Sequence, residues 1–160
     1  MDNGFARGEP KGKTMNAFSK TVLAGGVGAI TTTLLHELLR RLSPDAPRVD
    51  LLGMQAVARL LHGAGLRPPA HGPLYTLTLL GDLVSNTAYF SLVGAAPRAT
   101  GVVVGGALGA AAGVGAVYLP PYLSLSSRPT GRTRTTGAIT VALYTGGGLA
   151  AGLTYHALPA

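Results

Sequence analysis

The sequence predicts an all-α integral membrane protein, a four-helix bundle with one additional interfacial amphipathic helix. Only 12% of the 160 residues are charged, whereas about a quarter is usual for a soluble domain. The mean hydropathy is positive, at +0.35. Long uncharged runs alternate with short basic stretches, which is typical of several membrane spans rather than one soluble core. We therefore assign residues 21–160 to a single four-span transmembrane domain.

The composition also restricts the possible catalytic chemistry and the possible binding partners. The chain has no Cys, which excludes thiolate catalysis and thiolate metal ligands. The formal net charge is +7, but the basic residues lie beside the apolar runs and the chain has no Trp. The phosphate headgroups of a lipid bilayer therefore explain this charge better than nucleic acid does.

Residues 1–20 are polar, rich in Gly and Lys and without an apolar run, and are predicted to form a disordered tail. The first span is predicted over residues 21–39. We expect it to be uncleaved, because its apolar run continues as helix toward His36. Small residues follow one another at four-residue spacing on this helix, which lets helix backbones approach closely; they are Ala24, Gly28 and Thr32.

Two prolines, Pro44 and Pro47, separate this span from the next helix, because each pushes the residue before it out of helical geometry. Residues 50–63 then form a predicted amphipathic helix, with Asp50 well placed as its N-cap. This helix is too short and too polar to span a bilayer, so we expect it to lie at the interface. Its apolar face comprises Leu51, Met54, Val57, Ala58 and Leu61.

The second span is predicted over residues 74–95 and carries an acid, Asp82, in its interior. At a rise of about 1.5 Å per residue the span is roughly 30 Å long, the thickness of the hydrocarbon core. Polar side chains at helical spacing share one face, and because such a stripe would be costly against lipid, it must face protein or water. The predicted intramembrane polar site comprises Asp82, Ser85, Asn86 and Tyr89, with Thr78 one turn earlier.

A tight connection at residues 97–98 predicts that the second and third spans are antiparallel neighbours. The third span, 99–119, repeats glycine every four residues, at Gly101, Gly105, Gly109 and Gly113. This extended ridge predicts a close helix–helix contact and favours self-association or a membrane partner subunit. A basic loop and a fourth span at 136–158 complete the chain.

The charge distribution predicts the orientation. The first loop carries five Lys or Arg residues and the third loop three, which is eight of the thirteen in the chain. By the positive-inside rule both loops should be cytoplasmic.

Asp82 is the candidate for chemistry, and two interpretations stay open. It either fixes helix register through hydrogen bonds, or binds a proton or cation, because intramembrane acids commonly mark ion pathways. His36 and Glu37 close the first span and are candidate partners, although Glu37 could instead pair with Arg40 or Arg41. Asp82 lies about 12 Å inside the start of its span, so a contact with His36 would need tilt or a shifted boundary.

No cofactor and no metal are expected. Arg40 stands where an HExxH motif would need its second His. His36 and His156 should lie at opposite faces of the membrane, which excludes a bis-His haem. The chain has no GxSxG motif and no P-loop, so no catalytic residue is assigned.

The segment SPDAPRVDLLGMQA, followed by GDLVSNTAYFSLVG and by Pro-terminated, Gly-rich spans, resembles small multi-pass inner-membrane proteins of unknown function encoded in bacterial genomes. The resemblance covers most of the chain after Met15. It implies a multi-pass location in the bacterial inner (plasma) membrane, and it assigns no activity and no residue role.

Three hypotheses for the function follow. The preferred one is a membrane protein that self-associates or joins a larger assembly, with a small polar site around Asp82 that could serve transport or ligand binding. A structural accessory subunit is another. The third is a membrane-embedded enzyme acting on a lipid or isoprenoid at the first-loop interface, with acid–base or metal-binding groups supplied by His36, Glu37, Asp45 and Asp50.

Overall fold

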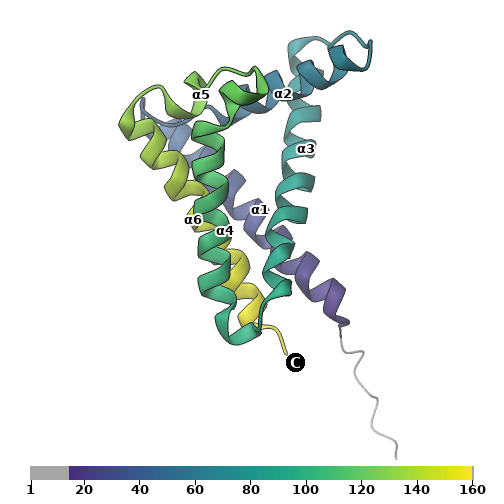
Figure 1. Cartoon of the computed structure of the whole chain (residues 1–160), viewed down its shortest axis with the longest axis vertical. Helices are drawn as coiled ribbons and strands as arrows, with labels where there is room; N and C mark the ends of the chain where they lie inside the picture. The colour runs from purple at the N-terminus through teal and green to yellow at the C-terminus, as the bar shows by residue number, and fades with distance from the viewer. Residues whose placement is uncertain (1–14, 160) are drawn as a thin grey trace, which may run out of the picture.

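The computed structural model describes residues 15–159, which are mainly helical and contain no strand (Figure 1). Three helical segments in this part of the chain are long and apolar enough to cross a membrane. They are α1 (Ala17–Leu42), α4 (Gly101–Tyr118) together with the short turn before it, and α6 (Arg134–Ala157). These features are those of a membrane protein.

The first helix begins earlier than predicted. α1 starts at Ala17 because the side chain of Asn16 accepts a hydrogen bond of 2.8 Å from the backbone N–H of Ser19 and so caps the helix. The end of the predicted disordered tail is therefore helical. Residues 1–14 of that predicted tail lie outside the described residues.

α3 (His71–Phe90) carries the predicted polar stripe, and a 3₁₀ segment, η1 (Ser91–Ala95), continues it. It is 20 residues long but is not among the three apolar helices, because the stripe lowers its hydropathy. Crossing of the bilayer by α3, and with it the four-helix membrane bundle, therefore stays a prediction.

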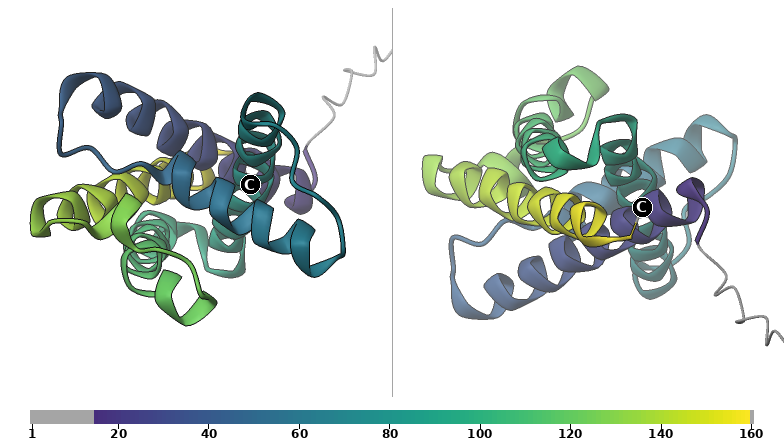
Figure 2. Two further views of the ribbon diagram at one scale, coloured as in Figure 1. Left: turned by 90° about the horizontal axis from the view of Figure 1, so that it is seen from above. Right: turned by 90° about the horizontal axis from the view of Figure 1, so that it is seen from below.

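α6 packs against both α1 and α4 (Figures 1 and 2). A Cβ atom at Gly105 would collide with the carbonyl oxygen of Gly148, and one at Gly113 would lie 2.6 Å from the Cα of Val141. Only glycine permits this approach, so the contact depends on the absence of side chains. The buried residues of α4 are the four ridge glycines, Gly101, Gly105, Gly109 and Gly113.

The glycine ridge of α4 thus forms an intramolecular contact with α6. Because this face is already covered, the ridge gives no support to self-association. α3 and α4 run antiparallel, as predicted for the second and third spans, but α3 packs mainly on α1 and contacts α4 only sparsely (Figure 1). A tight connection fixes the direction of two helices but not which faces they bury.

α2 (Val49–Gly63) crosses the ends of the long helices (Figure 2). It begins one residue before the predicted start, so Asp50 lies in its first turn rather than at the N-cap, which is Arg48. The third loop, with η3 (Pro120–Leu123) and α5 (Arg128–Gly131), lies at the same end. The backbone N–H of Arg48 donates to the carbonyl oxygen of Pro129 at 2.7 Å, which ties the first loop to the third.

Candidate functional site

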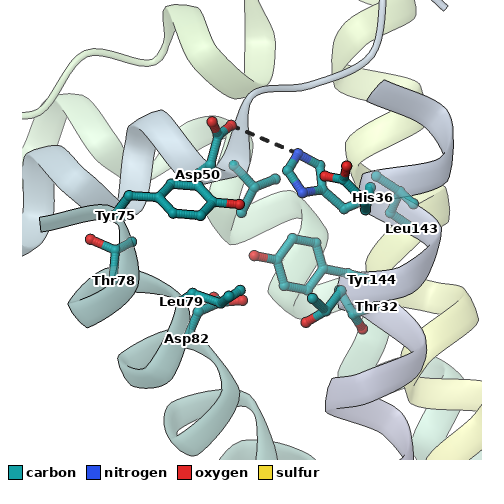
Figure 3. A pocket seen from close by; sticks show the side chains of 13 residues that line it. Thr32, His36, Asp50, Tyr75, Thr78, Leu79, Asp82, Leu143 and Tyr144 are labelled. Carbon is teal, nitrogen blue, oxygen red and sulfur yellow. Dashed lines mark ion pairs between the residues drawn. The ribbon is translucent and has the colours of Figure 1, made fainter. Parts of the chain in front are cut away.

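A small cavity lies beneath α2, between α1, α3 and α6 (Figure 3). Its volume is about 60 Å³, enough for a few water molecules. Many of its lining residues are polar or ionisable: Thr32, Thr33, His36, Glu37, Asp50, Tyr75, Thr78, Asp82 and Tyr144. The remaining wall comprises Val49, Gly53, Leu79 and Leu143.

His36 and Asp50 form the end of the cavity that lies under α2. His36 Nε2 is 2.9 Å from the carbonyl oxygen of Pro47 and 3.9 Å from Asp50 Oδ1. Because a carbonyl oxygen can only accept, Nε2 carries the hydrogen, and Nδ1 of a neutral His36 is left as a proton acceptor. The turn between Pro44 and Pro47 therefore orients this imidazole.

Asp50 is held ionised by its neighbours. Arg48 donates to it from Nε at 3.0 Å and from Nη2 at 2.8 Å. Burial acts to raise the pKa of Asp50, but the hydrogen bonds and charge of Arg48, together with His36, outweigh burial and bring the pKa below its usual range. Asp50 is thus a fixed negative charge beside His36.

Asp82 lies farther along α3 and lines the same cavity, into which the hydroxyl groups of Tyr75 and Tyr144 point (Figure 3). Among residues 15–159, no Lys, Arg or His nitrogen lies within 4.0 Å of its carboxylate. His36 and Asp82 therefore share one cavity without direct contact, and water could bridge their difference in depth.

A second, open groove runs between α3 and α4, with a volume of about 800 Å³. The four residues of the predicted polar site all line it: Asp82, Ser85, Asn86 and Tyr89. Tyr89 donates its hydroxyl hydrogen to the carbonyl oxygen of Leu108 at 2.9 Å, which links the two helices. The Nδ2 atom of Asn86 is buried and has no hydrogen-bond partner among the described residues. Asp82 and Tyr144 line both the groove and the cavity.

Three of the four residues of the enzyme hypothesis line the cavity, namely His36, Glu37 and Asp50. Glu37 is paired with Arg40 at 2.8 Å and with Arg41 at 2.9 Å. Asp45 does not line the cavity and lies on the outside near Arg132. In the part of the chain that the structure describes, no group of three or more His, Asp or Glu side chains could hold a metal ion.

Two tyrosines of the cavity escaped the sequence analysis. Tyr75 precedes Asp82 by seven residues, so the polar stripe could have been extended by two helical turns to include it. From the sequence, Tyr144 is interpreted as an interface anchor or a packing residue, and only 7% of it is exposed. Its place follows from the packing of α6 on α1, which local spacing does not reveal.

Comparisons of this chain with protein-family models, with curated proteins and with solved structures found no match.

Proposed function

We propose that this chain is a multi-pass membrane protein in which Asp82 binds a proton or cation, in the service of ligand binding or transport. The observation that carries the proposal is the position of Asp82. It lines both a small cavity and an open groove, and no Lys, Arg or His nitrogen of the described residues lies within 4.0 Å of its carboxylate. Intramembrane acids commonly mark ion or proton pathways.

The surface of α3 supports its place as the predicted second span. The stripe that contains Asp82 faces the cavity and the groove, whereas Leu80 and Val84 are exposed by 57% and 69% on other faces of the helix. In a bilayer these side chains would meet lipid tails, while the polar groups would meet water or protein. The four long helices of the proposed bundle are α1, α3, α4 and α6.

His36 is the proposed second station for the proton. Its Nδ1 can accept a proton, and the cavity that it shares with Asp82 is large enough for bridging water. The carboxylate of Asp50 lies 3.9 Å from Nε2 of the same imidazole. A proton could thus pass between the end of the bundle and Asp82.

The experiment compares wild type with Asp82→Asn, which keeps the size and hydrogen-bonding capacity of the side chain but cannot titrate. We expect the variant in detergent to melt near the wild-type temperature and to take up one proton fewer on acidification. A stable variant with unchanged proton uptake would leave Asp82 as a packing residue of a structural subunit. A strongly destabilised variant would instead indicate an ionised Asp82 paired with a buried cation.

The proposal includes a bacterial inner-membrane location with the first and third loops in the cytoplasm, on the charge bias of those loops. The proposal also includes self-association or binding of a membrane partner subunit. Such an interface would need a surface other than the glycine ridge.

A further inference from the structure

The groove between α3 and α4 has two unlike walls. The α3 wall is polar and carries one carboxylate, Asp82. The facing wall is apolar and built largely from small or aliphatic residues of α4 and the segment after it, namely Ala111, Ala112, Gly115, Ala116, Leu119 and Leu123. Among residues 15–159, no Lys, Arg or His lines the groove. A molecule with a hydrocarbon chain fits this groove only if it also carries a polar or charged group that can pair with the polar side chains of α3.

One polar atom of this wall lacks a partner. Asn86 is nine-tenths buried, and its Nδ2 donates to no acceptor among the described residues. A buried donor of this kind is normally satisfied by water or by a bound molecule. Asn86 lies one helical turn from Asp82 on the same face of α3. The carboxylate of Asp82 and the amide of Asn86 thus stand together on the α3 wall of the groove.

We propose that this groove binds an amphiphilic organic cation, and that the cation competes with a proton for Asp82. The inference rests on the proposed function of Asp82 and names the class of its ligand. The carboxylate supplies the complementary charge, and Tyr89 and Tyr144 supply aromatic rings that attract cations. At about 800 Å³ the groove has the size of sites that hold drug-sized molecules.

The competition follows from the groups that face Asp82. These are His36 and Glu37 from α1, Asp50 from α2, Tyr75 and Tyr89 from α3, and Tyr144 from α6, while α4 contributes none among the residues that line the two sites. Two of the acids are already paired with arginines, Glu37 with Arg40 and Asp50 with Arg48. Asp82 is therefore the acid available to a ligand. Where the carboxyl group of Asp82 is protonated, binding of one cation to it releases that proton, and a proton that returns displaces the cation.

The test measures binding of tetraphenylphosphonium to the purified full-length protein in nanodiscs, with tetraphenylborate as an anion of the same shape. We expect the phosphonium to bind more tightly than the borate. At pH values below the pKa of Asp82, the affinity for the phosphonium should fall about tenfold for each unit by which the pH is lowered, because each binding event displaces one proton. Asp82→Asn should abolish this pH dependence and weaken phosphonium binding at least tenfold.

A matched pair of variants tests the location. Ala111 and Val103 are both exposed on α4, but only Ala111 lines the groove. Ala111→Trp should therefore abolish binding, and Val103→Trp should leave it unchanged. Equal effects of the two variants would overturn the proposal even if Asp82→Asn failed to fold.

The remaining outcomes separate this proposal from the proposed function. Equal binding of phosphonium and borate, or no binding of either, would mean that lipid or a second copy of the chain fills the groove, and would overturn the cation site. Loss of one proton of uptake in Asp82→Asn without any phosphonium binding would leave the proton site standing and remove only its ligand.

Discussion

Asp50 shows how a charged residue can order one end of the proposed site. It lies within 3.9 Å of His36 Nε2 and accepts two hydrogen bonds from Arg48 Nε and Nη2 at 3.0 and 2.8 Å. The carbonyl of Pro47 holds the same imidazole nitrogen. These contacts join the end of α1 to the start of α2, so the charge of Asp50 bears on both the fold and the orientation of His36.

The pKa of Asp50 predicts an acid-sensitive contribution to stability. Because Arg48 and His36 bring this pKa below its unfolded value, the contribution is fully present above the unfolded value of about 4 and is lost as the pH falls through the folded value. The melting temperature of wild type should therefore fall on acidification below about pH 4 more steeply than that of Asp50→Asn. Parallel melting curves across that range would show that Asp50 has no favourable pairing in the fold.

At the scale of elements, the contact between α4 and α6 can be tested with the smallest side chain. In Gly109→Ala the added methyl group would collide with the carbonyl oxygen of Tyr144, so we expect a loss of about 1–3 kcal/mol in the free energy of unfolding. Gly81→Ala is the control, because a Cβ there meets nothing within 4 Å. The control should be neutral or stabilising by up to about 1 kcal/mol.

Thermal unfolding in detergent, followed by circular dichroism, measures both variants. A Gly109→Ala protein as stable as Gly81→Ala would mean that the two backbones do not approach as closely as described.

The sequence predicts the helices well and their partners poorly. Hydropathy and proline positions predict the four long helices and α2, and the polar stripe predicts four residues that share the groove. The four-residue glycine spacing in α4 predicts a close helix–helix contact but not which helix makes it, because close backbone approach depends on the surfaces of both helices. Gly148 and Gly152 on α6 repeat the same spacing, and they were the signal that could have identified that partner.

The cavity could not be predicted, since residues from three separate segments build its polar end. His36, Asp50 and Tyr144 meet only because the loop after α1 folds α2 back over the bundle and α6 packs on α1. No local pattern encodes such a meeting. The sequence predicts that His36 and Asp82 lie at different depths in their helices. In the structure the two residues line one cavity and make no direct contact.

At the scale of the whole molecule, contacts place the first and third loops at one end. The backbone N–H of Ser126 donates to Gln55 Oε1 at 3.0 Å, and Arg132 hydrogen-bonds the carbonyl oxygen of Pro44. If the bundle spans the bilayer, these two loops share a side of it. The charge bias predicts that this side is the cytoplasmic one.

Single cysteines can test this topology, because the chain has none of its own. Arg59→Cys on α2 and Tyr122→Cys on η3 lie at the loop end, and His156→Cys lies near the other end of α6; all three positions are exposed. In intact cells an impermeant maleimide should label only the His156 variant, and disruption of the cells should expose the other two. Labelling of the Arg59 and Tyr122 variants on opposite sides would rule out the proposed bundle.

The central claim is that the carboxyl group of Asp82 changes its protonation state at the junction of cavity and groove. Infrared difference spectroscopy between acidic and alkaline protein detects protonated carboxyl groups directly, without any ligand. We expect a carbonyl-stretching band in wild type that persists in Asp45→Asn, which removes an acid on the outside of the molecule, and disappears in Asp82→Asn. Identical difference spectra for wild type and Asp82→Asn would contradict the claim.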